Sequence, residues 1–419
     1  MKPHRRVFVV GGAHSTYLGR GHPDFVHRRH PDHGRRENPG LAEHLATAVG
    51  GAFAHAGVEA GEVDKAYVSN FLGECFVRQG HLGAALVDAA PGLAGKPVAR
   101  IEAACASGSA AIAACIDALQ AGCDVTLAAG VEIETNVPGR EGVDYMARAA
   151  HYEKSRALGQ FTFPAIFARR AKRYKEAFGA TDLDLARVVV KAYGNAARNP
   201  LALMRAVQVD LEAAMTPGEH NALFLEDEAL RPHMKMLDCT GFTDGASAVL
   251  LATEAGLVRL GLHPSRCTEI LAYGHTVQAL AGAADPTELT NVRRAAQIAY
   301  ADAGIGPTDL DVAEIHDCFS ITELQMYEAI GIAGPGGAPA LLRDGATAID
   351  GSIPVNTGGG LIGFGHPIGA TGIKQVFEVY RQMKGECGDY QMPTPPRHGL
   401  TANLGGDDRT AIVMVQRNC

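Results

Sequence analysis

A single histidine near the C-terminus lies in a segment whose composition suits close contact with a ligand. Residues 356–372 read Asn-Thr-Gly-Gly-Gly-Leu-Ile-Gly-Phe-Gly-His-Pro-Ile-Gly-Ala-Thr-Gly, so seven glycines surround His366. Glycine has no Cβ, and backbone N–H groups can therefore approach a bound molecule closely. Histidine exchanges a proton near neutral pH. The segment predicts a loop that presents His366 to a reacting group, although a phosphate-binding loop would explain the glycines as well.

A cysteine follows an apolar stretch and precedes a run of small residues. The segment around Cys105, residues 102–112, reads Glu-Ala-Ala-Cys-Ala-Ser-Gly-Ser-Ala-Ala-Ile. We expect a strand over 98–104 and a helix over 106–121, with Cys105 at the turn between them. A helix N-terminus favours the thiolate and offers backbone N–H groups to an oxyanion. The pattern indicates a nucleophile whose small neighbours leave room for a bulky substrate. An inert buried cysteine in a tight turn is the alternative.

Two further segments place polar groups at the ends of expected strands. His316 and Cys318 are two residues apart after a strand expected over 312–315, so their side chains should face the same way. A histidine and a cysteine that converge on a second histidine are poorly explained by packing. Asn403-Leu-Gly405 precedes the last expected strand, and its backbone N–H groups could donate to an oxyanion. A plain hairpin turn would explain that segment equally well.

Alternating strand and helix patterns predict an α/β fold with covered sheets. The other expected strands span 5–10, 63–71, 124–130, 246–253, 269–273, 400–404 and 410–416, and the other helices span 41–56, 164–178, 183–195, 286–303, 320–330 and 372–384. In both halves a reactive residue lies at a strand-to-helix turn, which indicates two related α/β halves. The predicted division is an N-terminal half of residues 1–130 plus 238–266, an inserted helical domain of 131–237, and a C-terminal half of 267–419.

Composition excludes several classes of protein. The chain has 419 residues, 47% of them hydrophobic and 20% charged, which is an ordinary globular mixture. The net charge of −8 argues against general nucleic-acid binding, and no apolar run reaches the ~20 residues of a membrane-spanning helix. The nine cysteines include no Cys-x-x-Cys pair, so we expect neither a disulfide framework nor a structural zinc site. This cysteine pattern indicates a reducing cytoplasm as the expected location, and the N-terminus lacks the long apolar region of a secretory signal.

Residues 14–38 form a basic stretch with five histidines and five arginines. These histidines lack the cysteine or carboxylate support of a typical metal site, so we predict no metal there. We expect a solvated loop that could meet an anionic ligand or a neighbouring subunit.

Together these segments resemble the thiolase superfamily over nearly the whole chain. The turn around Cys105 is similar to the thiolase nucleophile turn, and the glycine segment with His366 is similar to its histidine loop. Common thiolases have Asn-Glu-Ala-Phe where this chain has His316-Asp-Cys-Phe, and Cys-x-Gly where it has Asn403-Leu-Gly. That exchange resembles thiolases of the sterol-carrier-protein type, here expected without an appended sterol-carrier domain. The resemblance implies the thiolase fold, with two related α/β halves in a five-layered αβαβα core and a helical insert.

The resemblance also implies a CoA-dependent acyltransferase that cleaves or forms a 3-oxoacyl-CoA in fatty acid β-oxidation. Cys105 would be the nucleophile, His366 its base, and Cys318 the acid and base for the departing and incoming CoA groups. The side chains of His316 and His366 would form one oxyanion hole, and the N–H groups of Cys105 and Gly405 a second. CoA, a substrate rather than a bound cofactor, would contact Thr240, Gly241 and Ser247. A homodimer or homotetramer is expected, with no nucleic-acid or membrane partner.

Two other functions fit the same residues. A biosynthetic condensing enzyme of the superfamily would use Cys105 with His316 and His366, but decarboxylative condensation has no need for Cys318. A thiolase-like subunit that works with a small zinc-ribbon/OB-fold partner is the other function, and the basic stretch 14–38 could contact that partner.

Overall fold

Nine strands form one continuous mixed sheet in the computed structural model, which describes residues 1–419. From edge to edge the order is β3 (Val98–Ile101), β2 (Lys65–Ser69), β4 (Val125–Glu132), β5 (Gly245–Ala252), β1 (Val7–His14), β6 (Thr268–Val277), β9 (Thr410–Asn418), β8 (His398–Gly405) and β7 (Val312–Ile315). β2 runs parallel to β3 and β4, and β7 runs parallel to β8, whereas the other pairs are antiparallel. The pairing of β1 with β6 joins the strands of the two halves by hydrogen bonds.

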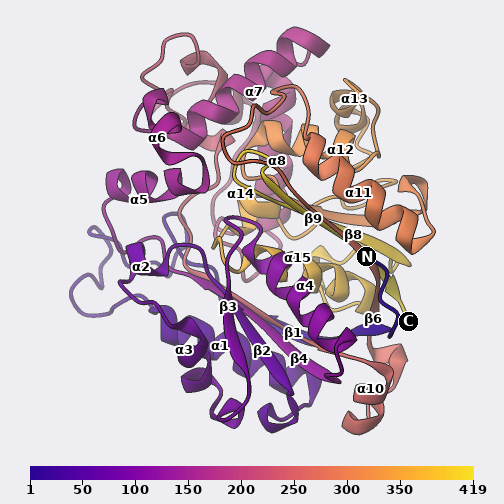
Figure 1. Cartoon of the computed structure of the whole chain (residues 1–419). Helices are drawn as coiled ribbons and strands as arrows, with labels where there is room; N and C mark the ends of the chain where they lie inside the picture. Colours follow the sequence, from indigo (N-terminus) through magenta and orange to yellow (C-terminus); the bar gives the residue numbers. More distant parts are fainter.

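Helices complete a five-layered arrangement (Figure 1). α4 (Ser107–Gln120) and α15 (Thr371–Lys384) pack against each other and lie between the two halves of the sheet. α1 (Leu41–Ala56) and α3 (Leu82–Ala89) cover the outer face of the N-terminal strands. α11 (Thr290–Ala303) covers the outer face of the C-terminal strands, with α12 (Ser320–Ala329) beside it. The predicted αβαβα fold is confirmed.

The crossing of α4 and α15 sets the distance between two loops that the sequence singled out. A Cβ added at Gly108 would lie 2.7 Å from the backbone nitrogen of Gly372, and one at Gly372 would lie 2.2 Å from that of Ser109. Only glycine permits such an approach of two backbones. Because Cys105 lies two residues before the start of α4 and His366 lies five residues before the start of α15, this contact brings their loops together.

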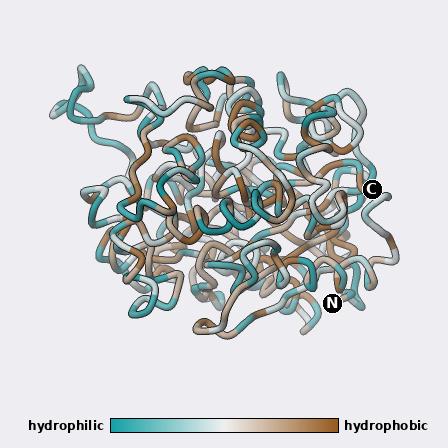
Figure 2. Tube along the Cα trace, turned by 90° about the horizontal axis from the view of Figure 1, so that it is seen from above, coloured by the Kyte–Doolittle hydropathy of each residue, from teal (hydrophilic) through white to brown (hydrophobic).

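Burial on both faces explains the continuous hydrophobic runs of the central strands. β4 and β5 are buried at every residue, as expected for strands covered by helices on both sides. Leu127 and Leu250 point into the cluster beside α1 and α3, whereas Ala128 and Val249 point into the cluster around α4 and α15. Hydrophilic segments lie mainly on the outer loops (Figure 2).

The segment between β4 and β5 is mainly helical, as the sequence predicts. It contains α5 (Gly139–Met146), α6 (Tyr152–Ser155), α7 (Thr162–Phe178), α8 (Asp182–Ala196) and α9 (Leu211–Met215). α7 and α8 share one hydrophobic cluster with α11, α12 and β7–β9, so the insert packs on the C-terminal half. The buried Arg170 of α7 also forms an ion pair with Asp407 at 2.7 Å. The residue boundaries of the three parts stay a prediction.

All predicted strands and helices are present, and most differ from the prediction only by a few residues at their ends. α1 and β7 begin and end at the predicted residues. The sequence did not predict several short helices, among them α2 (Gly73–Phe76), α10 (Glu254–Leu260), α13 (Ala338–Arg343) and α14 (Gly360–Phe364). Such helices span too few turns to show a helical hydrophobic period. None of the helices combines the length and the apolar character that a membrane span requires.

Candidate active site

A tight turn presents Cys105 to the interior of the molecule. Ala104, directly before it, has a positive φ of 50°, which is uncommon for a residue with a Cβ. The hydroxyl of Ser107 stabilises the turn with two hydrogen bonds. It accepts one from the N–H of Ala103 at 2.9 Å and donates one to the carbonyl of Ala104 at 2.6 Å. The thiol therefore projects from a fixed turn ahead of α4.

His366 lies on the loop between α14 and α15, and a threonine holds its ring. Its Nδ1 lies 2.6 Å from the hydroxyl of Thr371, which donates its own hydrogen to the carbonyl of Pro367 at 3.0 Å. A hydroxyl has a single hydrogen, so the Thr371 oxygen must accept from Nδ1–H of His366. The Nε2 atom of His366 then carries a lone pair and can accept a proton from Cys105.

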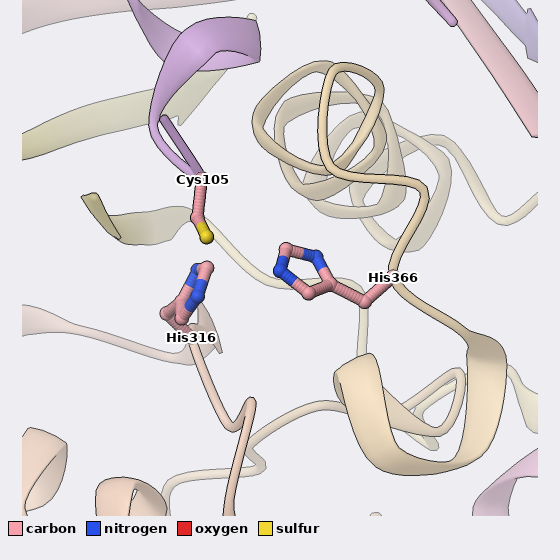
Figure 3. Close-up of side chains that lie close together, drawn as sticks. All are labelled: Cys105, His316 and His366. Carbon is pink, nitrogen blue, oxygen red and sulfur yellow. The ribbon is translucent and has the colours of Figure 1, made fainter. Parts of the chain in front are cut away.

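His316 approaches the same point from the end of β7. It is completely buried, and its Nδ1 lies 2.9 Å from Nδ2 of Asn403 on β8. The rings of His316 and His366 are nearly perpendicular, with centroids 5.0 Å apart. The sulfur of Cys105 and a nitrogen of each ring lie within 4.8 Å of one another (Figure 3). Thiol and imidazole groups also surround zinc in other proteins, but we interpret this cluster as a nucleophile with acid–base groups.

Cys318 lines the same cavity from the turn that leads into α12. Its thiol lies 3.8 Å from the hydroxyl of Thr322. Burial and the nearby Cys105 raise the pKa of Cys318 well above its ordinary value. The resting group is therefore a thiol, which is the form that can donate a proton.

Burial sets the protonation states of Cys105 and His366. It raises the pKa of Cys105 to about 12, although a hydrogen bond from the Gly406 backbone acts in the opposite direction. It lowers the pKa of His366 to about 3, with a further contribution from the positive charge of Lys374. The sequence predicted that the start of α4 would favour the thiolate, but loss of solvent around the sulfur outweighs that effect. A neutral thiol thus faces a neutral imidazole, and we expect the proton to move only when the sulfur attacks.

These residues open into a cavity of about 660 Å³ with mostly apolar walls. The rings of Phe167 and Phe319 stack in its wall with centroids 4.4 Å apart, which links α7 of the insert to the turn that carries Cys318. Arg20 and Arg140 line the same cavity and are exposed. Such a cavity can enclose an apolar acyl chain, and its arginines can meet the anionic part of a ligand. The phenylalanines that line it are Phe161, Phe163, Phe167, Phe224, Phe242 and Phe319.

Comparison with known families agrees with this geometry. The model of the thiolase N-terminal domain matches residues 32–255, and that of the thiolase C-terminal domain-like family matches residues 272–418. The chain belongs to the thiolase family. The resemblance predicted from the sequence is therefore confirmed.

Individual proteins support the same assignment of this thiolase. An acetyl-CoA acetyltransferase of Methanothermobacter thermautotrophicus is 36% identical over 366 residues, which cover 87% of this chain and 91% of the relative. Human sterol carrier protein 2 is 29% identical over 415 residues, which cover 96% of this chain and 70% of that protein. The solved Ltp2-ChsH2(DUF35) aldolase has a TM-score of 0.77 at 20% identity and covers 98% of this chain and 97% of its own, so it shares the fold.

The residues expected to contact CoA do not all reach the thiolase cavity. Thr240 and Gly241 line it. Ser247 lies in β5 instead, where it is completely buried and its hydroxyl bonds to His14 at 2.8 Å and to Tyr17 at 2.6 Å. Ser247 is therefore placed to stabilise the core rather than to touch a ligand in the cavity.

The turn after β8 presents Gly406, rather than Gly405, to the thiolase cavity. Gly406 lines the cavity, and its backbone hydrogen-bonds to Cys105. Gly405 pairs with Thr410 in the hairpin of β8 and β9. The sequence predicted an N–H donor in this turn, but the spacing alone could not decide which of two adjacent glycines faces the sulfur. The role of Gly405 in an oxyanion hole stays a prediction.

Two glutamates that no sequence motif indicated, Glu132 at the end of β4 and Glu134 two residues after it, anchor the histidine loop of this thiolase. Glu132 accepts from the N–H of Gly369 at 3.0 Å, and Glu134 accepts from the N–H groups of Ile368 at 3.1 Å and Thr243 at 2.9 Å. Burial raises the pKa of Glu132 to about 7 and that of Glu134 well above its ordinary value. The available signal was their position directly after a buried apolar strand, because carboxyl groups are rarely buried without partners.

Proposed function

We propose that this thiolase catalyses the CoA-dependent cleavage of a 3-oxoacyl-CoA, or the reverse Claisen condensation. The observation that supports the proposal is the meeting of Cys105, His366, His316 and Cys318 in one apolar cavity. Cleavage of the bond between C2 and C3 needs a nucleophile, a base to activate it, a donor for the enolate oxygen and an acid for the enolate carbon. Each of the four side chains can supply one of these functions.

In the first half-reaction the sulfur of Cys105 attacks the 3-oxo carbon, and its proton moves to Nε2 of His366. The bond between C2 and C3 then breaks, which leaves the acyl group on Cys105 and an acetyl-CoA enolate in the cavity. His316 stabilises the oxygen of this enolate. The thiol of Cys318 protonates the enolate carbon and becomes a thiolate, so that acetyl-CoA can leave.

In the second half-reaction the Cys318 thiolate takes the proton of an incoming CoA thiol. The CoA sulfur attacks the acyl carbon, and the N–H of Cys105, with a second from the turn at Gly405 and Gly406, holds the oxyanion. Cys105 leaves as a thiolate and recovers its proton from His366. Every group returns to its resting form, and CoA takes part only as a substrate. The proposal keeps CoA contacts at Thr240 and Gly241, whereas the position of Ser247 supports no such contact.

We further propose that the enzyme is a homodimer or homotetramer that works in the cytoplasm in fatty acid β-oxidation. All nine cysteines are free, which fits a reducing compartment. A second candidate is a thiolase subunit that needs a small zinc-ribbon/OB-fold partner. The likeness to the Ltp2-ChsH2(DUF35) aldolase, whose name joins two proteins, favours this candidate. Full activity of the purified chain alone would argue against it.

A panel of 3-oxoacyl-CoA esters, both aliphatic and aromatic, tests the proposed reaction. With free CoA, the wild type should consume at least one ester, seen as loss of the 3-oxo thioester absorbance, and should release acetyl-CoA. Cys105→Ala should be inactive while it keeps the circular dichroism spectrum of the wild type. Failure of the wild type to turn over any ester would contradict the proposal.

A further inference from the structure

Asn403 connects His316 to a chain of buried amides. Its Nδ2 lies 2.9 Å from Nδ1 of His316 and 3.1 Å from Oε1 of Gln375 on α15. Nε2 of Gln375 in turn donates to the backbone carbonyl of Ala402 at 3.4 Å. All three side chains are completely buried. The hydrogen bonds that they form are made with one another and with the backbone, and Oδ1 of Asn403 has no hydrogen-bond partner.

The carbonyl of Ala402 fixes the direction of each hydrogen bond in this chain. A carbonyl can only accept, so Gln375 turns its NH₂ group toward Ala402 and its oxygen toward Asn403. That oxygen needs a donor, which the NH₂ group of Asn403 supplies. The second hydrogen of this NH₂ group points at Nδ1 of His316, which must accept it. With the Asn403 amide reversed, two amide oxygens would face each other at this contact.

We propose that Asn403 is a positioning residue that holds His316 as the neutral tautomer with its hydrogen on Nε2. This nitrogen is buried and has no hydrogen-bond partner in the protein. The ring lies beside Cys105 at the cavity (Figure 3). A free N–H group at the reacting centre is the donor that an enolate oxygen needs. This catalytic use rests on the proposed thiolase reaction, whereas the position of the hydrogen does not.

The tautomer of His316 complements that of His366. Thr371 accepts from Nδ1–H of His366, whereas Asn403 donates to Nδ1 of His316, so the two rings turn opposite groups toward the cavity. His366 offers a lone pair that can take the proton of Cys105. His316 offers a hydrogen that can hold an oxyanion. Because Thr371 accepts a hydrogen bond and Asn403 donates one, the two histidines can serve different functions: His366 as a base and His316 as a hydrogen-bond donor.

Asn403→Asp tests this assignment, because a carboxylate can only accept a hydrogen bond. Neutral His316 would then carry its hydrogen on Nδ1 and turn a bare Nε2 toward the cavity, whereas the imidazolium form carries hydrogens on both nitrogens. We expect kcat of this variant to fall about 100-fold as the pH rises through the pKa of His316. KM should change little. The wild type carries the Nε2 hydrogen in both forms and should lack this decrease.

The groups around His316 should not produce the same decrease. The other titratable side chains that line the cavity with His316 are Arg20, Cys105, Glu134, Arg140, Cys239, Cys318 and His366. The neighbouring Asp317 accepts from backbone N–H groups of α14 instead. All of them are present in the wild type, so a decrease found only in Asn403→Asp belongs to the new pair of imidazole and carboxylate.

Asn199→Asp is the matched control. Asn199 is buried, and its Nδ2 donates to the carbonyl of Gly358 at 3.1 Å. Gly358 belongs to the glycine segment 356–372, which also contains His366. The substitution introduces an equivalent carboxyl group that does not bond to His316. Asn199→Asp can change the size of kcat, but the dependence of kcat on pH should keep the shape that it has in the wild type.

¹⁵N NMR of protein with labelled histidines locates the hydrogen directly, and His316→Gln identifies the signal. We expect an unprotonated Nδ1 in the wild type and an unprotonated Nε2 in Asn403→Asp at high pH. A wild-type Nδ1 that carries the hydrogen would overturn the inference, as would identical pH profiles for the two proteins. If Asn403→Asp does not fold, Asn403→Leu should lower kcat about tenfold at unchanged KM, because one orienting hydrogen bond is lost. An unchanged kcat would contradict the inference. The NMR measurement uses no substrate, so its failure is distinct from a failure of the proposed reaction.

Discussion

At the scale of the residue, the proposed chemistry depends on which atoms carry hydrogens. The four side chains predicted to be catalytic all line one cavity, and their motifs were sufficient to select them from the sequence. The partners that orient their rings, Thr371 and Asn403, were not assigned that function. Asn403 lies far from His316 in the sequence, and only the pairing of β7 with β8 brings the two together.

The raised pKa of Cys105 predicts how its thiol reacts with iodoacetamide. The reactive thiolate forms above the pKa, which burial raises to about 12, so the rate should increase steadily from about pH 6 to about pH 9. Mass spectrometry of the Cys105 peptide measures this rate, with the exposed Cys419 as a reference thiol. A constant rate over this range would indicate a preformed thiolate and would contradict the neutral pair.

The role of Cys318 predicts a selective defect in Cys318→Ala. Exchange of the acetyl-CoA methyl hydrogens in D₂O, followed by NMR, should slow at least about 100-fold, because the group that removes the proton is missing. Thiolytic cleavage should be lost with it, while Cys105 should still react with iodoacetamide. Exchange and cleavage at wild-type rates would show that Cys318 is not the acid and base, and would favour the condensing enzyme.

At the scale of the element, the starts of two helices fix the site. The hydrophobic pattern placed the beginnings of α4 and α15 within one residue of their observed positions. It could not reveal that the two helices cross at Gly108 and Gly372, because periodicity shows which face of a helix is buried and not what it meets. Gly372, the last glycine of the segment 356–372, therefore serves helix packing.

Gly372→Ala should disturb this crossing. Because the added Cβ would lie 2.2 Å from the backbone nitrogen of Ser109, one helix must move. We expect the free energy of unfolding to fall by about 1–3 kcal/mol and kcat to fall with it. Gly50→Ala in α1 is the control, since nothing lies within 4 Å of its added Cβ, and alanine should raise stability by about 0.5–1 kcal/mol. Chemical denaturation measures the free energy of unfolding of both variants. Equal changes in Gly372→Ala and Gly50→Ala would contradict the close crossing of α4 and α15.

At the scale of the whole molecule, the cavity lies where the two halves and the insert meet. Cys105 comes from the N-terminal half, His316 and His366 come from the C-terminal half, and Phe163 and Phe167 come from the insert. The sequence predicted a helical insert but not its shared core with the C-terminal half, which depends on contacts between distant segments.

The first histidine of the basic stretch 14–38 also differs from the expectation of a solvated loop. His14 is buried, and its Nε2 lies 3.1 Å from Glu378 on α15. Its position at the end of β1 places it in the core. His22 is buried as well, and composition alone could not separate these two residues from the exposed His27 and His33.

The insert should control which acyl groups the enzyme accepts. Phe163→Ala enlarges the cavity, so the ratio of kcat/KM for a bulky ester to that for a short one should rise about tenfold. Phe178→Ala is the control, because Phe178 lies at the other end of α7, is 37% exposed and does not line the cavity. If this ratio of kcat/KM values is unchanged in Phe163→Ala, the insert does not control which acyl groups the enzyme accepts.

Trapping the acyl-enzyme is the most direct test of the claim that Cys105 carries the acyl group between two half-reactions. The enzyme is mixed briefly with a 3-oxoacyl-CoA in the absence of free CoA, quenched in acid, digested and analysed by mass spectrometry. We predict that the peptide with Cys105 gains the mass of the shortened acyl group, and that added CoA removes it. An unmodified Cys105 peptide, or an acyl group found on Cys318 instead, would contradict the mechanism.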